Sequence, residues 1–124
     1  MRKQKFTIEG RLDGVNELIS ANRKSPYVGA KEKRKQQNIC IRSIRASKIR
    51  PVLNYPVFIC IKWIERNGLR DPDNIAGAKK FILDALQETK ILKNDGQREI
   101  KFLSDAFAID KKFPRIEVSI IENG

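Results

Sequence analysis

Three aspartates in the second half of the chain have the residue type and spacing that can hold a divalent cation. Asp71 and Asp73 stand two residues apart in the stretch RDPDN, residues 70–74, and Asp95 follows in KNDG, residues 93–96. Two carboxylates at the junction of a strand and a helix can converge on one point, as Mg²⁺ and Mn²⁺ require of their oxygen ligands. The spacing therefore indicates a candidate metal site.

RDPDN also has a purely structural interpretation. Asp is a favoured N-cap, Pro is favoured at the first helical position, and a further acid in the first turn suits the positive end of the helix dipole. With Asp71 as the cap and Pro72 at the first position, both aspartates have a use without any metal. Asp95 by itself belongs to a common turn sequence. On these residues alone, the helix cap is the better supported interpretation.

The composition narrows the chemistry. The 124 residues include no His, which excludes a Ser-His-Asp triad, a Cys-His dyad and the His-containing zinc sites. Cys40 and Cys60 belong to no CxxC or Cys/His cluster, so we expect both to be reduced. A cation site in this chain would be built from carboxylates, and such a site favours Mg²⁺ or Mn²⁺ over zinc.

The positive charge lies mainly in the first half of the chain. The formal net charge is +11, and residues 1–50 hold 14 Lys and Arg against 4 Asp and Glu. Ten of these basic residues fall between Arg23 and Arg50, a composition that suits a phosphate backbone. The alternative is a solvated basic stretch, and charge alone does not distinguish DNA, RNA or acidic lipid. Acids that bind a metal, within a protein that attracts phosphate, are what phosphodiester hydrolysis needs.

The region from residue 70 to 100 resembles the signature of the RusA-type Holliday junction resolvases, a bacterial and phage family of small endonucleases. The similar elements are Asp71-Pro-Asp73-Asn74, Lys80, Leu83-Asp-Ala-Leu86 and Asp95-Gly96, within about 30 residues. The resemblance implies an intertwined homodimer that uses Mg²⁺, with Mn²⁺ as a possible substitute. It also implies that Asp71, Asp73 and Asp95 are the metal-binding catalytic acids and that Lys80 is the catalytic lysine.

The lysine departs from the family pattern, which places it four residues after the second Asp. Gly77 stands there, and Lys79 and Lys80 follow at six and seven. At about 100° per residue, a continuous helix would keep Lys80 on the face of Asp73 and turn Lys79 away. We therefore prefer Lys80. The expected DNA-binding residues are Arg70, Lys79, Lys93 and Arg98 near the acids, and Lys33, Arg34, Lys35, Arg42 and Arg45 in the basic segment.

The apolar pattern predicts a single α+β domain over residues 1–124, with a mixed β-sheet flanked by helices. We expect strands at 5–12, 57–65, 100–109 and 115–122, and helices at 15–23, 29–49 and 74–89. The strand at 57–65 is almost continuously apolar and should be central and buried on both faces. The last two strands, joined by a short connection, should form an antiparallel pair.

The helix between the aspartates limits how they meet. It would be about 24 Å long, and the six residues after it can return only about 20 Å when extended. Either the helix is shorter or bent, or Asp95 approaches from the side, or a second subunit supplies it. A dimer with two-fold symmetry would also suit a four-way junction, which needs two symmetric cuts.

The expected function is a Mg²⁺-dependent endodeoxyribonuclease that resolves Holliday junctions, that is four-way DNA junctions, in recombination and repair. The alternatives are a nucleic-acid-binding protein without catalysis, and a nuclease that acts on flaps or replication forks. The most apolar run, residues 57–64, has only eight residues, so we expect no membrane span. The basic start, residues 1–10, has no apolar segment behind it, and we expect a cytoplasmic protein with no small-molecule cofactor.

Overall fold

Four strands with alternating apolar side chains form one mixed sheet in the computed structural model, which describes residues 1–123. They are β1 (Arg2–Glu9), β2 (Val57–Glu65), β3 (Ile100–Ile109) and β4 (Arg115–Glu122). Their order is β1-β4-β2-β3. β2 is parallel to β3, and β4 is antiparallel to both β1 and β2. The predicted α+β domain with a mixed sheet and a central strand at 57–65 is confirmed.

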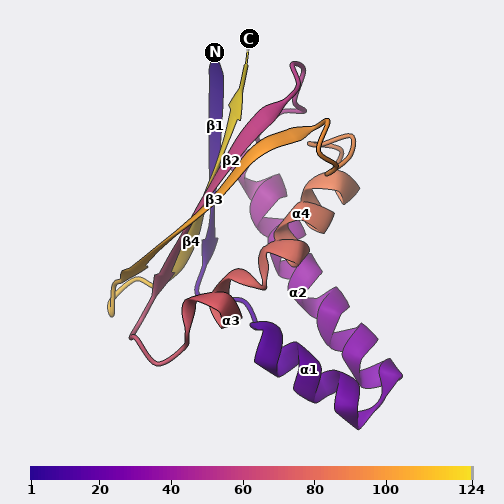
Figure 1. Cartoon of the computed structure of the whole chain (residues 1–124), viewed down its shortest axis with the longest axis vertical. Helices are drawn as coiled ribbons and strands as arrows, with labels where there is room; N and C mark the ends of the chain where they lie inside the picture. Colours follow the sequence, from indigo (N-terminus) through magenta and orange to yellow (C-terminus); the bar gives the residue numbers. More distant parts are fainter. Residues whose placement is uncertain (124) are drawn as a thin grey trace.

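All the helices lie on one face of the sheet (Figure 1). They are α1 (Val15–Lys24), α2 (Pro26–Ser47), α3 (Pro72–Ala76) and α4 (Lys79–Glu88). The core forms where this face meets the helices, and includes Phe6, Ile8, Ile44, Ile59, Trp63, Ile82, Leu86 and Val118. The opposite face is open, with Phe58 44% exposed and Lys62 also exposed. The prediction that β2 is buried on both faces is therefore wrong, because helices cover only one.

The expected antiparallel pairing of the last two strands is also wrong. β2 lies between β3 and β4 and forms hydrogen bonds with each of them. The connection at residues 110–114 steps across the end of β2, a distance of about 10 Å for two strand spacings. Five residues can span that distance easily, so the short connection between β3 and β4 does not require the two strands to be neighbours in the sheet.

β1 and α2 differ from the prediction only at their ends. β1 begins at Arg2 and ends at Glu9, before Gly10, whose φ of 76° breaks the strand. α2 begins three residues earlier than expected because Pro26 is its first residue and the Ser25 hydroxyl caps it, accepting from the Val28 N–H at 3.0 Å. It ends at Ser47, where Lys48 adopts the left-handed conformation.

The single helix expected over residues 74–89 is two helices, α3 and α4, with a break at Gly77 and Ala78. Val15 of α1 packs against the break so closely that a Cβ on Gly77 would lie 1.9 Å from the Val15 Cγ2 atom. This contact requires glycine at the position. Gly77 and Ala78 keep right-handed helical angles, but the N–H groups of Ala78 and Phe81 bond to carbonyls three residues back. The rotation of 100° per residue that placed Lys80 on the face of Asp73 therefore does not hold across this turn.

None of the helices in residues 1–123 has the length and apolar character needed to cross a membrane.

Candidate metal site

Asp71 and Asp73 line one cavity of about 460 Å³, together with residues at the start of α1. Asp71 occupies the N-cap of α3 with extended backbone, and Pro72 is the first helical residue, as predicted. The Asp71 side chain nevertheless forms no capping hydrogen bond within the described chain. Asp73 Oδ1 accepts from the N–H of Asn74 at 3.0 Å. Both aspartates are exposed, so the cap position leaves carboxylate oxygens free for a ligand.

Asn74 ties this loop to the start of α1. Its side chain is buried, and Oδ1 accepts a hydrogen bond from the Asn16 N–H at 2.8 Å. Gly14 allows this approach, because a Cβ there would lie 2.5 Å from both the carbonyl oxygen and the Oδ1 atom of Asn74. The Asn of the Asp-Pro-Asp-Asn stretch therefore has a structural task, which is to fix the loop that carries the two aspartates.

Arg70 is turned inward rather than toward solvent, with a side chain only 11% exposed. Its Nε and Nη2 atoms donate to the two carboxylate oxygens of Glu65 at 2.8 and 2.9 Å, and Nη1 donates to the Leu12 carbonyl at 3.1 Å. Burial alone would lower the pKa of Arg70, but its hydrogen bonds to Glu65 and the negative charges of Glu65 and Glu17 outweigh burial and raise the pKa. The guanidinium of Arg70, which was predicted to face DNA, therefore mainly holds the loop before Asp71 in place.

Glu17 of α1 is a third carboxylate in the cavity, and the sequence did not single it out. It accepts from the Gly14 N–H at 3.1 Å and lies 3.5 Å from Arg70 and 3.6 Å from Arg11. Two guanidinium groups thus balance its charge. Its spacing of three residues after Gly14 matches a capping arrangement, and this signal indicates a helix start rather than a metal ligand.

Asp95 does not join the other two aspartates within one subunit. It precedes Ile100, which lies beside Val57 at the start of β2, whereas Asp71 follows Glu65 at the end of β2. A nine-residue strand spans about 27 Å, and Figure 1 shows α3 and the loop after α4 at opposite ends of the sheet. The reason is topological: β3 is parallel to β2, so the chain must return to the start of the sheet before β3 begins.

Within residues 1–123, no three acidic, His or Cys side chains gather in a group that could hold a metal ion. The length of the connecting chain left open whether Asp71, Asp73 and Asp95 converge inside one subunit. Among the described residues they do not.

No protein-family model matches this chain, and no curated protein matches it either. The interpretation of the site therefore depends on its own geometry.

The two candidate lysines have different surroundings. Lys79, at the start of α4, donates to Asp105 of β3 at 2.5 Å, and Asp105 also accepts from the Trp63 Nε1 atom at 2.8 Å. Lys80 is 67% exposed and lies 3.7 Å from Asp84 on the same helix. Lys79 is thus held in place against the sheet, while Lys80 has a weak surface pair and can move toward a bound phosphate.

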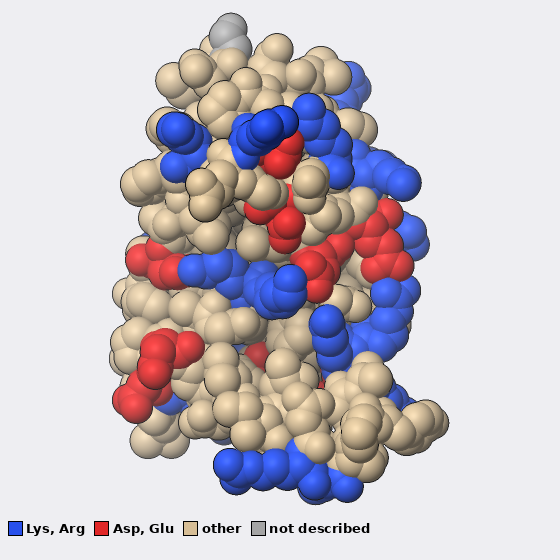
Figure 2. All heavy atoms as spheres, turned by 45° about the vertical axis from the view of Figure 1, so that its right-hand side comes forward, with Lys and Arg blue, Asp and Glu red and all other residues tan. Residues whose placement is uncertain are grey.

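Basic side chains from α2 and from the loop after α4 are spread over the surface. In the view of Figure 2, Lys and Arg side chains gather along the right-hand edge of the molecule, next to a group of Asp and Glu side chains. Lys35, Arg42, Arg45 and Arg98 are exposed, and Lys33 is half-buried. Arg34 instead forms a two-pronged pair with Glu88 at 2.8 and 2.9 Å, which raises the pKa of Arg34. Lys93 lies over the ring of Tyr55, 4.7 Å from its centre.

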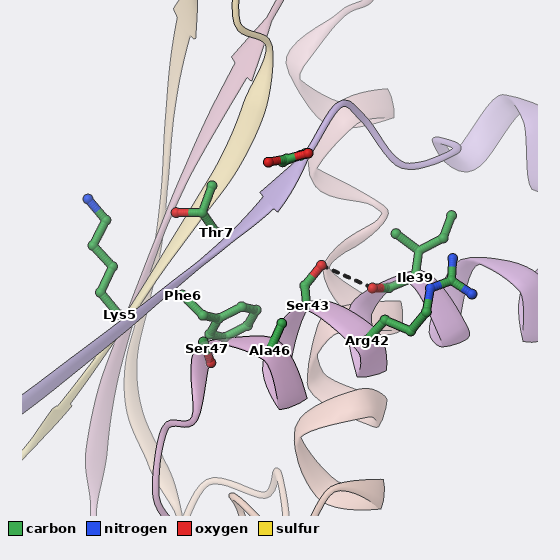
Figure 3. A pocket seen from close by; sticks show the side chains of 9 residues that line it. Lys5, Phe6, Thr7, Ile39, Arg42, Ser43, Ala46 and Ser47 are labelled. Atoms are coloured by element: carbon green, nitrogen blue, oxygen red, sulfur yellow. Dashed lines mark hydrogen bonds between the residues drawn. The ribbon is translucent and has the colours of Figure 1, made fainter.

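A second hollow lies between β1 and α2 and has a volume of about 750 Å³. Lys5 of β1 and Arg42 of α2 are among its lining residues, with their side chains extending outward from the two elements, and Ser43 donates to the Ile39 carbonyl on the α2 side (Figure 3). Its lining residues are all different from those of the cavity at Asp71. The hollow is lined by two cations, Lys5 and Arg42, and one carboxylate, Glu9.

The donors at Asp71 and Asp73 fit a hard divalent cation. Mg²⁺ in proteins keeps several waters and is held by one or two carboxylates together with substrate phosphates. Two exposed aspartates on a loop fixed by Arg70 and Asn74 supply such a partial site. The third carboxylate of this cavity, Glu17, is paired with Arg11 and Arg70, and Asp95 of the same subunit lies at the other end of the sheet.

Proposed function

We propose that the protein is a Mg²⁺-dependent endodeoxyribonuclease that resolves four-way DNA junctions as a homodimer. The observation that carries the proposal is the position of Asp71 and Asp73. They share one cavity, and the Asp71 carboxylate serves no cap. A chain of net charge +11 would attract phosphate to these acids. The order of the motif from Asp71 to Asp95, which resembles the RusA-type resolvases, adds support.

Asp95 would act on the site of the other subunit. The sheet separates it from Asp71 and Asp73 of its own chain by about the length of β2. A two-fold symmetric dimer can bring opposite ends of two identical chains together, so each site would combine Asp71 and Asp73 of one subunit with Asp95 of its partner. The two sites would then cut two strands symmetrically.

The residues have distinct tasks in this proposal. Asp71, Asp73 and the partner's Asp95 would hold Mg²⁺, with Mn²⁺ as a substitute, and the bound metal would supply an activated water and charge compensation at the scissile phosphate. Lys80, mobile on the surface of α4, would offset charge on the phosphate in the transition state. Arg70 would hold the metal-binding loop in place through Glu65.

The DNA backbone would be held by basic side chains on α2 and after α4. Lys35, Arg42, Arg45 and Arg98 are exposed and available for phosphate. Lys33 and Lys93 would contribute at the edges of this surface, and Arg34 would first have to leave Glu88. Contacts to phosphate carry no sequence information, so the protein would recognise the shape of a branched DNA.

The first test is cleavage of a synthetic four-way junction with Mg²⁺ by the parent protein and by Asp73→Asn. We expect symmetric cuts by the parent and a loss of at least about 100-fold in the variant, because one metal ligand is removed. Glu9→Gln is the matched control, since Glu9 is an exposed carboxylate that does not line the cavity at Asp71. Equal activity of the parent and Asp73→Asn would show that the aspartates only begin a helix.

The second test asks whether the site is shared. Asp73→Asn and Asp95→Asn are each expected to be inactive, and mixed dimers are formed by refolding the two together. In a shared arrangement, one of the two sites in the mixed dimer regains all its acids, so nicking of one strand returns. If Asp95 acted in its own chain, both sites of the mixed dimer would stay inactive.

Two other functions are outcomes of the same experiments. Binding of the junction without any cut by the parent would indicate a nucleic-acid-binding protein in which Asp71 is a helix cap. Faster cleavage of flaps or replication forks than of the four-way junction would keep the chemistry and change the substrate.

A further inference from the structure

We propose that the open edge of β3 pairs with β3 of a second copy of this chain, antiparallel, about a two-fold axis at Leu103. β2 is the only strand that pairs with β3 among the described residues, so the outer edge of this ten-residue strand is unpaired. Unpaired N–H and C=O groups along such an edge form a template for another strand. This inference rests on the proposed function only in assuming a homodimer, and it identifies the strand edge through which the two copies would pair.

The other edge of the sheet is protected, and β3 is not. β1 carries four charged residues among its eight, and the Gln4 side chain joins it to Arg50 by two hydrogen bonds, at 2.8 and 2.7 Å. β3 has the sequence IKFLSDAFAI, with two charged residues in ten and no Pro. Natural edge strands that stay unpaired are usually short, charged or interrupted by Pro. The composition of β3 is that of a strand with neighbours on both sides.

Apolar side chains are exposed along β3 on both faces of the sheet. Of the thirteen large hydrophobic side chains that are exposed, four lie on this strand: Phe102, Leu103, Phe107 and Ile109. Phe102 also packs with exposed Phe58 of β2, with ring centres 5.6 Å apart. A second β3 would cover part of this surface and pair the backbone at the same time, which explains why apolar residues occur at an edge.

The charges on β3 select the register of the pair. With the two-fold axis at Leu103, Lys101 of each copy lies opposite Asp105 of the other. An axis at Lys101 or at Asp105 would place like charges together, and an axis at Ser104 would leave both charges without a partner. Asp105 already accepts from Trp63 and Lys79, but a carboxylate has about four lone-pair sites and can accept from Lys101 as well. Only the axis at Leu103 joins opposite charges.

This arrangement has a consequence for the metal site. Antiparallel pairing reverses the second copy, so the start of its β3 lies at the end of the first copy's β3. That end is also where β2 leads into Asp71, because Ile109 pairs with Glu65. The turn that contains Asp95 of the second copy therefore lies at the same end of the sheet as Asp71 and Asp73. The symmetry also keeps the helices of both copies on one face of an eight-stranded sheet, so the two α2 helices face the DNA together.

Cysteine cross-linking tests the register without disturbing the fold. In a Cys60→Ser background, with Cys40 buried, we introduce Leu103→Cys or, as the matched control, Phe107→Cys. A residue on the two-fold axis meets its own copy, so Leu103→Cys should form an intermolecular disulfide under mild oxidation, and Phe107→Cys should form far less. Cross-linking of Phe107→Cys but not of Leu103→Cys would overturn the proposed register.

Sedimentation velocity tests the surface itself, in the absence of DNA and Mg²⁺. Leu103→Glu would place two carboxylates together on the axis and should weaken the dimer at least about 100-fold. Ile19→Glu, on the exposed apolar side of α1, should leave the dimer unchanged. A parent that is monomeric at high micromolar concentration, or a dimer dissociated only by Ile19→Glu, would overturn the inference. A β3 dimer that fails to cut junctions would contradict the nuclease proposal alone.

Discussion

Gly14 lies so close to Asn74 that a methyl group on Gly14 would stand 2.5 Å from the Asn74 carbonyl oxygen. Asn74 in turn accepts a hydrogen bond from the Asn16 N–H at 2.8 Å. The start of α1 and the loop at Asp71–Asn74, about 60 residues apart in sequence, are thus fitted to each other. The geometry of the two aspartates depends on a contact that no pattern around RDPDN reveals.

Gly14→Ala should therefore weaken both the fold and the candidate site. Because the atoms that clash are backbone oxygen and a buried amide, we expect a loss of about 1–3 kcal/mol in the free energy of unfolding. Junction cleavage should fall more than DNA binding, since the loop with Asp71 and Asp73 is displaced. Urea denaturation and cleavage rates measure the two effects. Gly68→Ala is the control, because its added Cβ would meet only Ile109 at an ordinary 3.6 Å. Equal stability of the two variants would contradict this assignment.

Arg70→Met should destabilise the protein because it leaves the buried carboxylate of Glu65 without its partner. Removal of one member of a buried ion pair costs about 3–5 kcal/mol, and thermal unfolding would show a lower Tm. The double variant Arg70→Met with Glu65→Gln should recover much of the loss, since no unpaired charge remains.

Arg98→Ala is the matched control for Arg70, because it removes an exposed guanidinium. We expect its Tm to be unchanged and its affinity for DNA to fall. If Arg70→Met kept the parent's Tm and lost only DNA affinity, then Arg70 would face the DNA, as the resemblance to the resolvases implies.

The free energy of unfolding should depend on pH through the titration of Asp13. Burial, together with a hydrogen bond to Glu32 and the charge of Glu32, raises the pKa of Asp13 from 3.8 to about 6, while the pKa of Glu32 is lowered. The folded state therefore holds the Asp13 proton more tightly than the unfolded state does. The stabilisation from this proton is complete below about pH 3.8 and is lost as the pH rises through about 6.

Asp13→Asn should be more stable than the parent at pH 7.5, because an amide can donate to Glu32 without carrying charge. We expect a gain on the order of 1 kcal/mol after allowance for solvent screening, and no gain at pH 4. Tm values measured from pH 4 to pH 8 test this difference. Glu9→Gln, which changes an exposed carboxylate, should follow the parent at every pH. A constant Tm difference across the range would show that Asp13 titrates normally.

The sequence predicted the elements well because their signals are local. A nearly continuous apolar run located β2, alternation located β4, and Pro72 marked the start of α3. The prediction failed where contacts between residues distant in sequence determine the structure. Val15 packs on Gly77 at the point where one amphipathic pattern is divided into two helices. The position of β2 between β3 and β4 follows from packing of the whole sheet, which a five-residue connection cannot specify.

The candidate site shows the same division between local and distant signals. Asp71 and Asp73 lie together because they are two residues apart, and the sequence alone could predict that. The resemblance to the resolvases implied that Arg70 faces DNA, but its guanidinium binds Glu65 at the end of β2 and is turned inward. The separation of Asp95 follows from the parallel pairing of β2 and β3, which the sequence did not reveal.

The basic surface of α2 should give DNA binding a steep salt dependence to which individual residues contribute unequally. Arg42 and Arg45 are exposed, whereas Arg34 is held by both carboxylate oxygens of Glu88. Each phosphate contact contributes about 0.9 to the slope of log K against log salt concentration on duplex DNA. Arg42→Gln with Arg45→Gln should therefore reduce the slope by about 2, and Arg34→Gln should change it less. Fluorescence anisotropy with a labelled four-way junction between about 50 and 200 mM salt measures the slope. Equal slopes for the parent and the Arg42 and Arg45 double variant would show that the DNA follows another path.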